Sequence, residues 1–278
     1  MIGSAVTPYL KKQGHKVFCL VRRAAGAGEI QWDPEGGRID PSAVEGFDGV
    51  VHLASMPWPA RWTPKSKEQI YNNRIQTNKL LASTLADCHH KPQVLICASG
   101  MGIYPDSSDQ ILTEDSTVGT DFLAHLQYDG EAATAPASTV GIRVVNLRIP
   151  GVLGGAGLKR NLGRMGSGRQ WTSWIGRDEL ACIVDYVLMN DALSGPINPT
   201  SPNPVRNAEF AATLSRALGR KPGLPMPAFV LRLLLGEMAE ALILASRRII
   251  PAKLLAAGYR FRFPNLEVAL LHELGINA

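Results

Sequence analysis

The chain has 278 residues, of which 45% are hydrophobic and 19% are charged, and its formal net charge is +5. This length allows one large α/β domain or one and a half domains, and the composition is that of a soluble globular protein. The basic residues are scattered apart from short pairs, which argues against a nucleic-acid-binding stripe and favours a small anionic ligand.

The amino-terminal segment predicts a helix followed by a buried strand. Val6 and Leu10 lie four residues apart, as on one helix face, and Gly14 can end the helix. Lys16–Val21 then predicts a strand, so the two elements form the second half of a strand–helix–strand unit. No strand precedes Ile2, and the first half of the unit is therefore absent. A start codon placed too late and a truncated chain both explain this, and we favour the first.

We therefore expect a parallel sheet that lacks its central first strand. Its absence should leave an exposed edge, or a gap between the strands near Val17 and Val50 and the strand near Val94. Either defect should lower the stability of the fold.

Two arginines, Arg22 and Arg23, directly follow the Lys16–Val21 strand. In a dinucleotide-binding fold this position reads the adenosine ribose, where an acidic residue favours NAD and an arginine accommodates the 2′-phosphate of NADP. No acidic residue stands directly there. The pair therefore predicts a preference for NADP, and two solvated loop arginines are the alternative.

Strands and helices alternate through the next part of the chain. The predicted strands are Ile30–Pro34, Phe47–Ser55, Val94–Ala98 and Val140–Pro150, and the predicted helices are Lys65–Asp87 and Asp121–Ala137. Sustained alternation of this kind is typical of a doubly wound parallel sheet in the α/β class.

The predicted strand Val94–Ala98 is uncharged, as in a strand buried on both faces, and it ends in Ser99-Gly100. Open α/β sheets bind ligands beyond the carboxyl ends of their strands. Ser99 and Tyr104 are therefore expected where a cofactor and a substrate meet. A core strand followed by an ordinary loop explains the same residues, and the sequence leaves both interpretations open.

After Gly157 the pattern loosens into a smaller, α-rich lobe. Its predicted elements are a short aromatic strand, Arg169–Ile175, and helices at Asp178–Asn190, Asn207–Leu218, Ala228–Ser246 and from Leu266 onward. Asn207 and the acidic residue that follows it are similar to a capping box at the start of their helix.

The most apolar stretch, residues 228–250, includes Arg232, Glu237 and Glu240. It therefore lacks the roughly 20 uninterrupted apolar residues of a membrane-spanning helix. We expect both glutamates to point outward and four leucines to form a packed face: Leu231, Leu234, Leu235 and Leu242. A core role within the lobe is favoured, and a homodimer interface is the alternative.

Cys19, Cys88, Cys97 and Cys182 are far apart, form no C-x-x-C motif and follow no signal peptide. Reduced thiols in a cytoplasmic protein are therefore expected. No histidine lies near a cysteine pair, and His89-His90 is typical of a solvated helix end, so we expect no metal site.

Nine sequence pieces, in order along nearly the whole chain, carry a family resemblance. They are V-V-H-L-A-S, R-W-T-P-K-S-K, N-R-I-Q-T-N-K-L-L, A-S-G-M-G-I-Y-P, L-T-E-D-S, V-N-L-R-I-P-G-V-L-G, R-Q-W-T-S-W-I, N-P-V-R-N-A-E-F-A and I-P-A-K-L-L-A-A-G-Y-R-F-R-F-P. The chain resembles the extended short-chain dehydrogenase/reductase superfamily and its NAD-dependent epimerase/dehydratase group. More narrowly, it is similar to the epimerase-family proteins with a C-terminal domain of unknown function. The resemblance implies a Rossmann-type NAD(P)-binding domain over residues 1–155, without its first strand, and a substrate-side lobe over residues 156–278.

The resemblance also implies which residues meet the cofactor. Ala54 and Ser55 would flank its ribose and pyrophosphate, and Asn73 and Thr77 match the polar positions of the helix that follows. Arg148, with the segment Gly151–Gly154, matches the stretch that lines the nicotinamide side. Of the chemistry, Ser99 matches the catalytic serine that donates a hydrogen bond to the substrate oxygen, and Tyr104 matches the tyrosine beside it.

Three departures from the family pattern bear on function. Gly3 matches only the last glycine of the G-x-x-G-x-x-G loop, which brings backbone N–H groups to the pyrophosphate. By register with Glu131, the positions of the superfamily's tyrosine–lysine pair hold about Leu123 and Gln127. After W-I, only Asp178 remains of the family's usual histidine and aspartate.

Two functions therefore stay open. One is an NADP-dependent oxidoreductase or epimerase that acts on a small, sugar-like substrate, which Ser99, Tyr104 and the arginine pair favour. The other is a catalytically inactive nucleotide-binding or scaffold protein that keeps the fold, which the missing loop and lysine favour. We expect weak or lost NADP binding and negligible dehydrogenase turnover from the 278-residue form. Neither a nucleic acid nor a membrane is expected as a partner.

Overall fold

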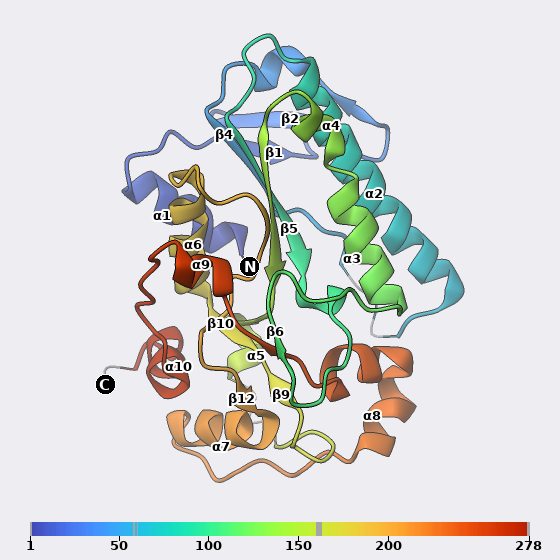
Figure 1. Cartoon of the computed structure of the whole chain (residues 1–278), viewed down its shortest axis with the longest axis vertical. Coiled ribbons are helices and arrows are strands. Elements are labelled where there is room, and N and C mark those ends of the chain that lie inside the picture. The colour runs from blue at the N-terminus through green and yellow to red at the C-terminus, as the bar shows by residue number, and fades with distance from the viewer. Residues whose placement is uncertain (1, 58, 60, 160–162, 277–278) are drawn as a thin grey trace.

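A four-stranded parallel sheet lies at the centre of the structure, a computed structural model that describes residues 2–57, 59, 61–159 and 163–276 (Figure 1). Its strands, in the order β11-β7-β5-β4, are Gly195–Ile197, Arg143–Ile149, Val94–Gly100 and Gly49–His52. β5 and β7 pair along their full length, which places Ser99 directly opposite Arg148. The predicted α/β class with a parallel sheet is confirmed.

Helices cover both faces of this sheet (Figure 1). On one face, α1 (Gly3–Lys12) packs against α6 (Arg177–Leu188), and both cover Ile96 and Leu147 of the sheet. The other face carries α2 (Pro64–Asp87), α3 (Phe122–Ala132) and α4 (Ala135–Thr139). Apolar side chains of β5 therefore meet helices on both sides, which explains why this strand contains no charge.

A second, smaller sheet holds the strands that precede β4. β1 (Cys19–Val21) pairs in parallel with β2 (Glu29–Asp33), which pairs antiparallel with β3 (Arg38–Ile39). Among the described residues, no strand joins β1 to β4, as expected for a sheet without a central first strand. Because β4 and β5 are paired, the gap lies between β1 and β4, and the expectation of a gap between the Val50 and Val94 strands is wrong.

The remaining elements are short and lie mostly toward the α-rich end of the molecule (Figure 1). They are β6 (Ile111–Leu112), β8 (Gly151–Leu153), α5 (Gly155–Leu158), β9 (Trp171–Thr172), β10 (Trp174–Gly176), β12 (Val205–Arg206), α7 (Asn207–Ala217), α8 (Ala228–Leu235), β13 (Arg248–Ile249), α9 (Ala252–Ala256) and α10 (Leu266–Leu274), with 3₁₀ turns at Pro41–Val44 and Met101–Ile103 and a π-helical segment at Ala239–Leu244. The pairs β8–β10, β9–β12 and β6–β13 form three two-stranded sheets. Both α6 and β11 follow residue 155 and yet belong to the central layers, and the domain boundary at residue 155 stays a prediction.

Two predicted helices are interrupted. The Asp121–Ala137 prediction covers both α3 and α4, and the second of these begins next to Pro136. The Ala228–Ser246 prediction ends at Leu235, because Gly236 adopts φ 59° and ψ −135°, a conformation that favours glycine.

The side chains of the α8 region correct two further expectations. Leu231 is buried as predicted, but Leu234 is 58% exposed, so the predicted packed face is wrong at that position. The capping box at Asn207 is also wrong, because its Oδ1 accepts a hydrogen bond from the backbone N–H of Met165 at 2.8 Å instead of capping α7.

In the part of the chain that the structure describes, no helix has both the length and the apolar character needed to cross a membrane. The same residues contain no group of three or more His, Cys, Asp or Glu side chains that could hold a metal ion.

Candidate active site at the carboxyl edge of the sheet

Ser99 lies at the carboxyl end of β5, facing α3. Its hydroxyl donates a hydrogen bond to Glu131 Oε1 at 2.7 Å and lies 3.4 Å from Gln127 Oε1. Its side chain is buried, with 8% of the residue exposed. The hydroxyl proton therefore points toward the Glu131 carboxylate, and the oxygen's lone pairs are left to accept a hydrogen bond.

Glu131 is held in place by Arg148, the residue that β7 puts beside Ser99. Arg148 Nε donates to Glu131 Oε1 and Nη2 donates to Oε2, both at 3.0 Å. Burial by itself would lower the pKa of Arg148, but the hydrogen bonds and charge of Glu131 outweigh it, and the pKa is raised. The pair is a fixed, bidentate ion pair, the strongest geometry for these two groups.

Tyr104 lies on the other side of Arg148 and is fully buried. Its hydroxyl donates to Asn198 Oδ1 at 2.8 Å and accepts a hydrogen bond from Arg148 Nη1 at 2.9 Å. Burial raises the pKa of the phenol. This geometry does not favour the predicted catalytic role of Tyr104, because its hydroxyl has no open side, and it assigns the residue to positioning Arg148.

Most N–H donors of the Arg148 guanidinium are already used in hydrogen bonds within the protein. Besides its bonds to Glu131 and Tyr104, Nη1 donates to the carbonyl of Glu114 at 3.0 Å. The Glu114 side chain is buried as well and accepts a hydrogen bond from the backbone N–H of Asn198 at 3.0 Å. The predicted contact of Arg148 with the nicotinamide side is therefore not favoured, and the geometry assigns it a structural role.

On α3, the positions that correspond to the missing tyrosine–lysine pair hold an apolar residue, Leu123, and an amide, Gln127. Leu123 is buried in a cluster with Ile70 of α2, and Gln127 is buried beside Ser99 and Gly100. His125 is exposed on the outer side of α3, as expected for a helix-surface residue. The titratable group at Ser99 is instead the Glu131 carboxylate, which accepts a hydrogen bond from the serine hydroxyl.

The carboxyl end of β1 carries the arginine pair. Arg23 makes a two-pronged ion pair with Glu29, at 2.7 and 2.6 Å, whereas Arg22 lies 3.9 Å from Glu35 with both side chains exposed. The sequence reasoning missed Glu29, which lies at the start of β2, next to β1. Arg22, beside a hollow of about 740 Å³ lined by β2 and β3, is therefore the arginine that can meet a phosphate.

The carboxyl end of β4 continues into Ala54 and Ser55, both exposed. From α2, Arg74 reaches this point, where Nη1 donates to the carbonyl of Ala98 at 2.9 Å and Nη2 lies 3.4 Å from Ser55 Oγ. Asn73 is half-buried, and its carbonyl accepts a hydrogen bond from the Thr77 hydroxyl. Arg74 was not among the predicted site residues, although it stands inside the N-R-I-Q-T piece.

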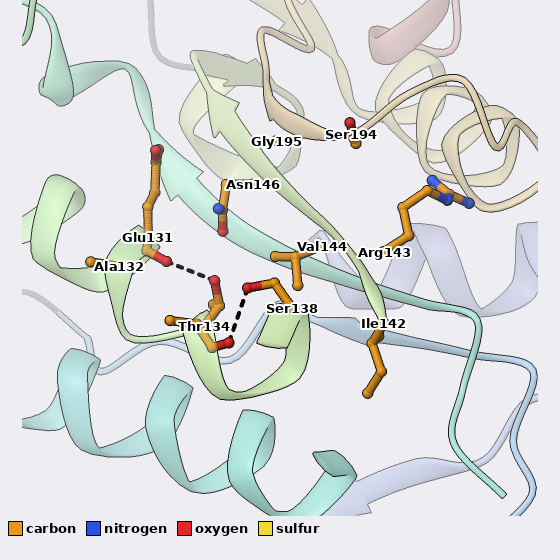
Figure 2. Close-up of a pocket in the computed structure, with 11 residues that line it drawn as sticks. Glu131, Ala132, Thr134, Ser138, Ile142, Arg143, Val144, Asn146, Ser194 and Gly195 are labelled. Carbon is orange, nitrogen blue, oxygen red and sulfur yellow. Dashed lines mark hydrogen bonds between the residues drawn. The ribbon is translucent and has the colours of Figure 1, made fainter. Parts of the chain in front are cut away.

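A separate hollow of about 470 Å³ opens between the α3–α4 turn and the strands β7 and β11 (Figure 2). Thr134 and Ser138 turn their hydroxyls to the backbone carbonyls of Glu131 and Ala135, at 2.6 and 3.0 Å. Asn146 projects from β7 and is buried, and its Oδ1 has no hydrogen-bond partner in the described structure. The hollow therefore has an unpaired amide oxygen in its wall.

A profile of the NAD dependent epimerase/dehydratase family matches residues 1–177, more than half of the chain. The chain belongs to this family. Residues 226–273 also match a domain of unknown function, DUF1731. The resemblance to epimerase-family proteins that carry such a C-terminal domain is therefore confirmed.

Relatives in this family cover the chain from end to end. Epimerase family protein Mb2239 of Mycobacterium bovis is 38% identical over 97% of this chain and 93% of its own length. The crystal structure of human epimerase family protein SDR39U1 with NADPH has a TM-score of 0.89 and 30% identity, covering 99% of this chain and 96% of that one. A nucleoside-diphosphate sugar epimerase from Corynebacterium glutamicum has a TM-score of 0.83 and 36% identity, covering 99% of this chain and 56% of that one.

Membership in the NAD-dependent epimerase/dehydratase family implies a nicotinamide dinucleotide, and the carboxyl edge of the sheet fits one. Arg22 is an exposed guanidinium directly after β1, and exposed Ala54 and Ser55 leave the end of β4 open. Gly3 begins α1, and a Cβ atom there would meet no atom within 4 Å, so the start of this helix is open as well. A helix amino terminus favours phosphate groups.

Proposed function

We propose that this epimerase-family protein binds NADPH in preference to NADH, across the carboxyl ends of β1, β4 and β5. The observation that carries the proposal is Arg22, an exposed guanidinium beside a hollow at the end of β1, whose contact with the exposed Glu35 is long, at 3.9 Å. Arginine at this position accommodates the 2′-phosphate that NADPH has and NADH lacks. The NADPH in the crystal structure of human SDR39U1 supports the same choice.

We propose that the substrate is small and sugar-like, and that its reacting oxygen lies at Ser99. The nucleoside-diphosphate sugar epimerase among the similar structures supports this substrate class. Bound NADP(H) would supply hydride chemistry. Glu131 and Arg148 keep the Ser99 hydroxyl in one orientation, so that the serine oxygen can accept a hydrogen bond from a substrate hydroxyl.

A second candidate, dinucleotide binding without turnover, rests on a different observation. Tyr104 is enclosed, and the α3 positions of the acid/base pair hold Leu123 and Gln127. Loss of an acid/base group near neutral pH costs about 10²–10⁴ in rate. We therefore expect negligible dehydrogenase turnover from the 278-residue chain.

Fluorescence titration with NADPH and NADH tests the binding proposal. We expect tighter binding of NADPH, and Arg22→Gln should remove the difference while leaving NADH affinity unchanged. Lys79→Gln, which removes a charge from an exposed position on α2, is the matched control. Equal affinity for both dinucleotides in the wild type, or tighter NADH, would refute the assignment.

A panel of carbonyl and nucleotide-sugar substrates then separates the two candidates. Turnover that Ser99→Ala and Tyr104→Phe both abolish would refute the second candidate and show that Tyr104 acts in the chemistry. Turnover that Ser99→Ala alone abolishes would support a Ser99 oxygen that accepts a hydrogen bond from the substrate, with Tyr104 positioning Arg148.

Two further properties remain proposals. We propose a cytoplasmic location, on the basis of the four free cysteines Cys19, Cys88, Cys97 and Cys182. A homodimer through the α8 region is proposed because Phe229, Leu233 and Leu234 are exposed on this one helix. A monomeric mass in light scattering would remove the dimer.

A further inference from the structure

Arg74 is a cation that the fold carries inward to the sheet edge. Its stem leaves α2 and packs against Gly130 of α3, where an added Cβ atom would lie 3.0 Å from Arg74 Cγ. Its guanidinium reaches the carboxyl ends of two strands at once, because Nη1 donates to Ala98 of β5 and Nη2 approaches Ser55 after β4. Both ends of the side chain are thus held in place.

The charge on this guanidinium has no counter-ion in the described structure. Among the described residues, no carboxylate lies within 4.0 Å of Arg74, whereas Arg148, a buried arginine nearby in the sheet, is paired with Glu131 at 3.0 Å. Arg74 contacts a neutral carbonyl and a neutral hydroxyl instead. Burial lowers its pKa, as expected for a cation that is withdrawn from water without a partner.

The neighbours of Arg74 do not supply a negative charge. His52, at the end of β4, is buried, and burial followed by the charge of Arg74 lowers its pKa to about 4, so the imidazole is neutral at neutral pH. Burial raises the pKa of the Cys97 thiol to about 12, so it is neutral as well. A half-buried cation among neutral groups is stabilised when an anion binds beside it.

The Nη2 end of the guanidinium lies toward Ser55, which follows β4. Ser55 is exposed, so a ligand that contacts Ser55 Oγ also comes within reach of Arg74 Nη2. The guanidinium carries five N–H donors, of which the contacts to Ala98 and Ser55 use two. Its remaining donors match the paired oxygens of a phosphate group.

We infer that Arg74 is a phosphate-binding residue, which holds the pyrophosphate of the dinucleotide from the β4–β5 side of the site. The inference rests on the proposed function, because it takes NADPH as the ligand. It separates two tasks. Arg22, at the end of β1, distinguishes NADPH from NADH, and Arg74, at the ends of β4 and β5, binds the group that both dinucleotides share.

Binding measurements on Arg74→Gln test this division of tasks. We expect the affinities for NADPH and for NADH to fall together by about tenfold, in keeping with loss of a charge-assisted hydrogen bond, so that their ratio is unchanged. Inorganic pyrophosphate should displace NADPH from the wild type and do so less well from the variant. Salt should weaken binding to the wild type more steeply than to the variant, because one charge contact is gone.

Two further variants make the result decisive. Lys79→Gln removes the same charge from an exposed position on the same helix and should leave both affinities unchanged. Arg74→Lys keeps the charge without the planar fork and should fall between the wild type and Arg74→Gln. If circular dichroism shows that Arg74→Gln does not fold, the Arg74→Lys result alone decides, and wild-type affinity there overturns the inference.

The outcomes distinguish the inference from the proposed function. Suppose that the wild type prefers NADPH and that Arg74→Gln binds each dinucleotide with wild-type affinity. The Arg74 inference is then overturned and the proposed function stands. If Arg74→Gln lowers NADPH affinity alone, Arg74 contacts the 2′-phosphate and the inference is again wrong. If the wild type binds neither dinucleotide, both proposals fall.

Discussion

Glu131 and Arg148 form a buried ion pair whose members depend on each other. Their side chains are 12% and 7% exposed, and the pair also orients Ser99 and Tyr104. In such a pair the main energetic effect appears when one partner is removed, because the other charge remains buried without compensation. The residue that orients the candidate catalytic serine is therefore also a strong determinant of stability.

Glu131→Gln should lower the free energy of unfolding by about 3–5 kcal/mol, since Arg148 would keep its charge in a buried position. Urea denaturation measures the change. A double variant, Glu131→Leu with Arg148→Met, should recover most of the loss, because it removes both charges. A single variant as stable as the wild type would contradict this account of the pair.

Two buried asparagines of the central sheet region, Asn146 on β7 and Asn198 directly after the neighbouring strand β11, offer a matched comparison. Asn198 accepts a hydrogen bond from the Tyr104 hydroxyl at 2.8 Å and donates to the carbonyl of Ile250 at 3.2 Å. Asn146 is also buried, but its Oδ1 has no partner among the described residues. The same substitution should therefore have opposite effects at the two positions.

Asn146→Leu should raise the free energy of unfolding by about 1 kcal/mol, because it removes an unsatisfied polar group. Asn198→Leu should lower it by about 1–3 kcal/mol, because Tyr104 and the Ile250 carbonyl would lose their partner. Thermal and urea denaturation check both. A loss of stability in Asn146→Leu as large as in Asn198→Leu would show that the Asn146 amide is hydrogen-bonded in solution.

At the scale of single elements, α10 is joined to α6 through a buried carboxyl group. The side chain of Glu273 is 1% exposed, and its Oε1 accepts a hydrogen bond from the backbone N–H of Asp178 in the first turn of α6 at 3.0 Å. Burial raises the pKa of Glu273, and the charge of Asp178 adds to this, although the Asp178 N–H and Arg177 act in the opposite direction. The contact between these two helices therefore depends on pH.

The folded chain holds a proton on Glu273 more tightly than the unfolded chain does. As the pH rises from the ordinary glutamate pKa of 4.5 through the raised folded value, the contribution of this group to stability is lost. Glu273→Gln cannot ionise, so it should gain stability relative to the wild type across this window. Urea denaturation over a pH series measures the difference.

Glu267→Gln, at a half-exposed position on the same helix, is the control for loss of a charge. Its difference from the wild type should change little over the same window. A Glu273→Gln difference that stays constant with pH would count against the raised pKa.

Much of the element pattern follows from the sequence, and the failures have identifiable physical causes. The predicted helix Lys65–Asp87 matches α2 within one residue. Its helical pattern of apolar residues continues over many turns, and a capping box at Thr63 fixes its start. The short edge strand β11 contains Pro196 and carries no alternating pattern, so its sequence predicts a turn instead. The break at Gly236 depends on a backbone conformation that local composition does not specify.

Part of the geometry at the sheet edge follows from the sequence, and the roles of the candidate site residues stay predictions. Ser99 and Arg148 lie side by side as parallel strand ends require. Glu131, Asn198 and Arg74 were not predicted, because each reaches the site from a distant segment whose side-chain direction depends on tertiary packing. The pairing of Arg23 with Glu29 was missed for the same reason, since it requires the β1–β2 register.

At the scale of the whole molecule, the central sheet and the small β1–β3 sheet share side-chain contacts, but among the described residues no strand of one is hydrogen-bonded to a strand of the other. Leu20 and Ile30 of the small sheet pack in the same apolar cluster as Leu95 of the central sheet. Within the described residues, β4 is hydrogen-bonded to β5 and to no other strand, and β1 is hydrogen-bonded to β2 and to no other strand. Apart from the chain itself, side-chain packing therefore joins the small sheet to the central sheet in the described part of the structure.

This division has a consequence for how the molecule opens over time. The strands β1 to β3 can separate from the central sheet without breaking a backbone hydrogen bond between strands of the two sheets. Their amide protons should therefore exchange through a sub-global opening of low free energy. The amides of β5 and β7, each bonded on both sides or buried, should exchange only when the whole chain unfolds. Arg22 stands at the end of the faster segment, so a dinucleotide that binds there should slow exchange in β1 before it slows exchange in β5.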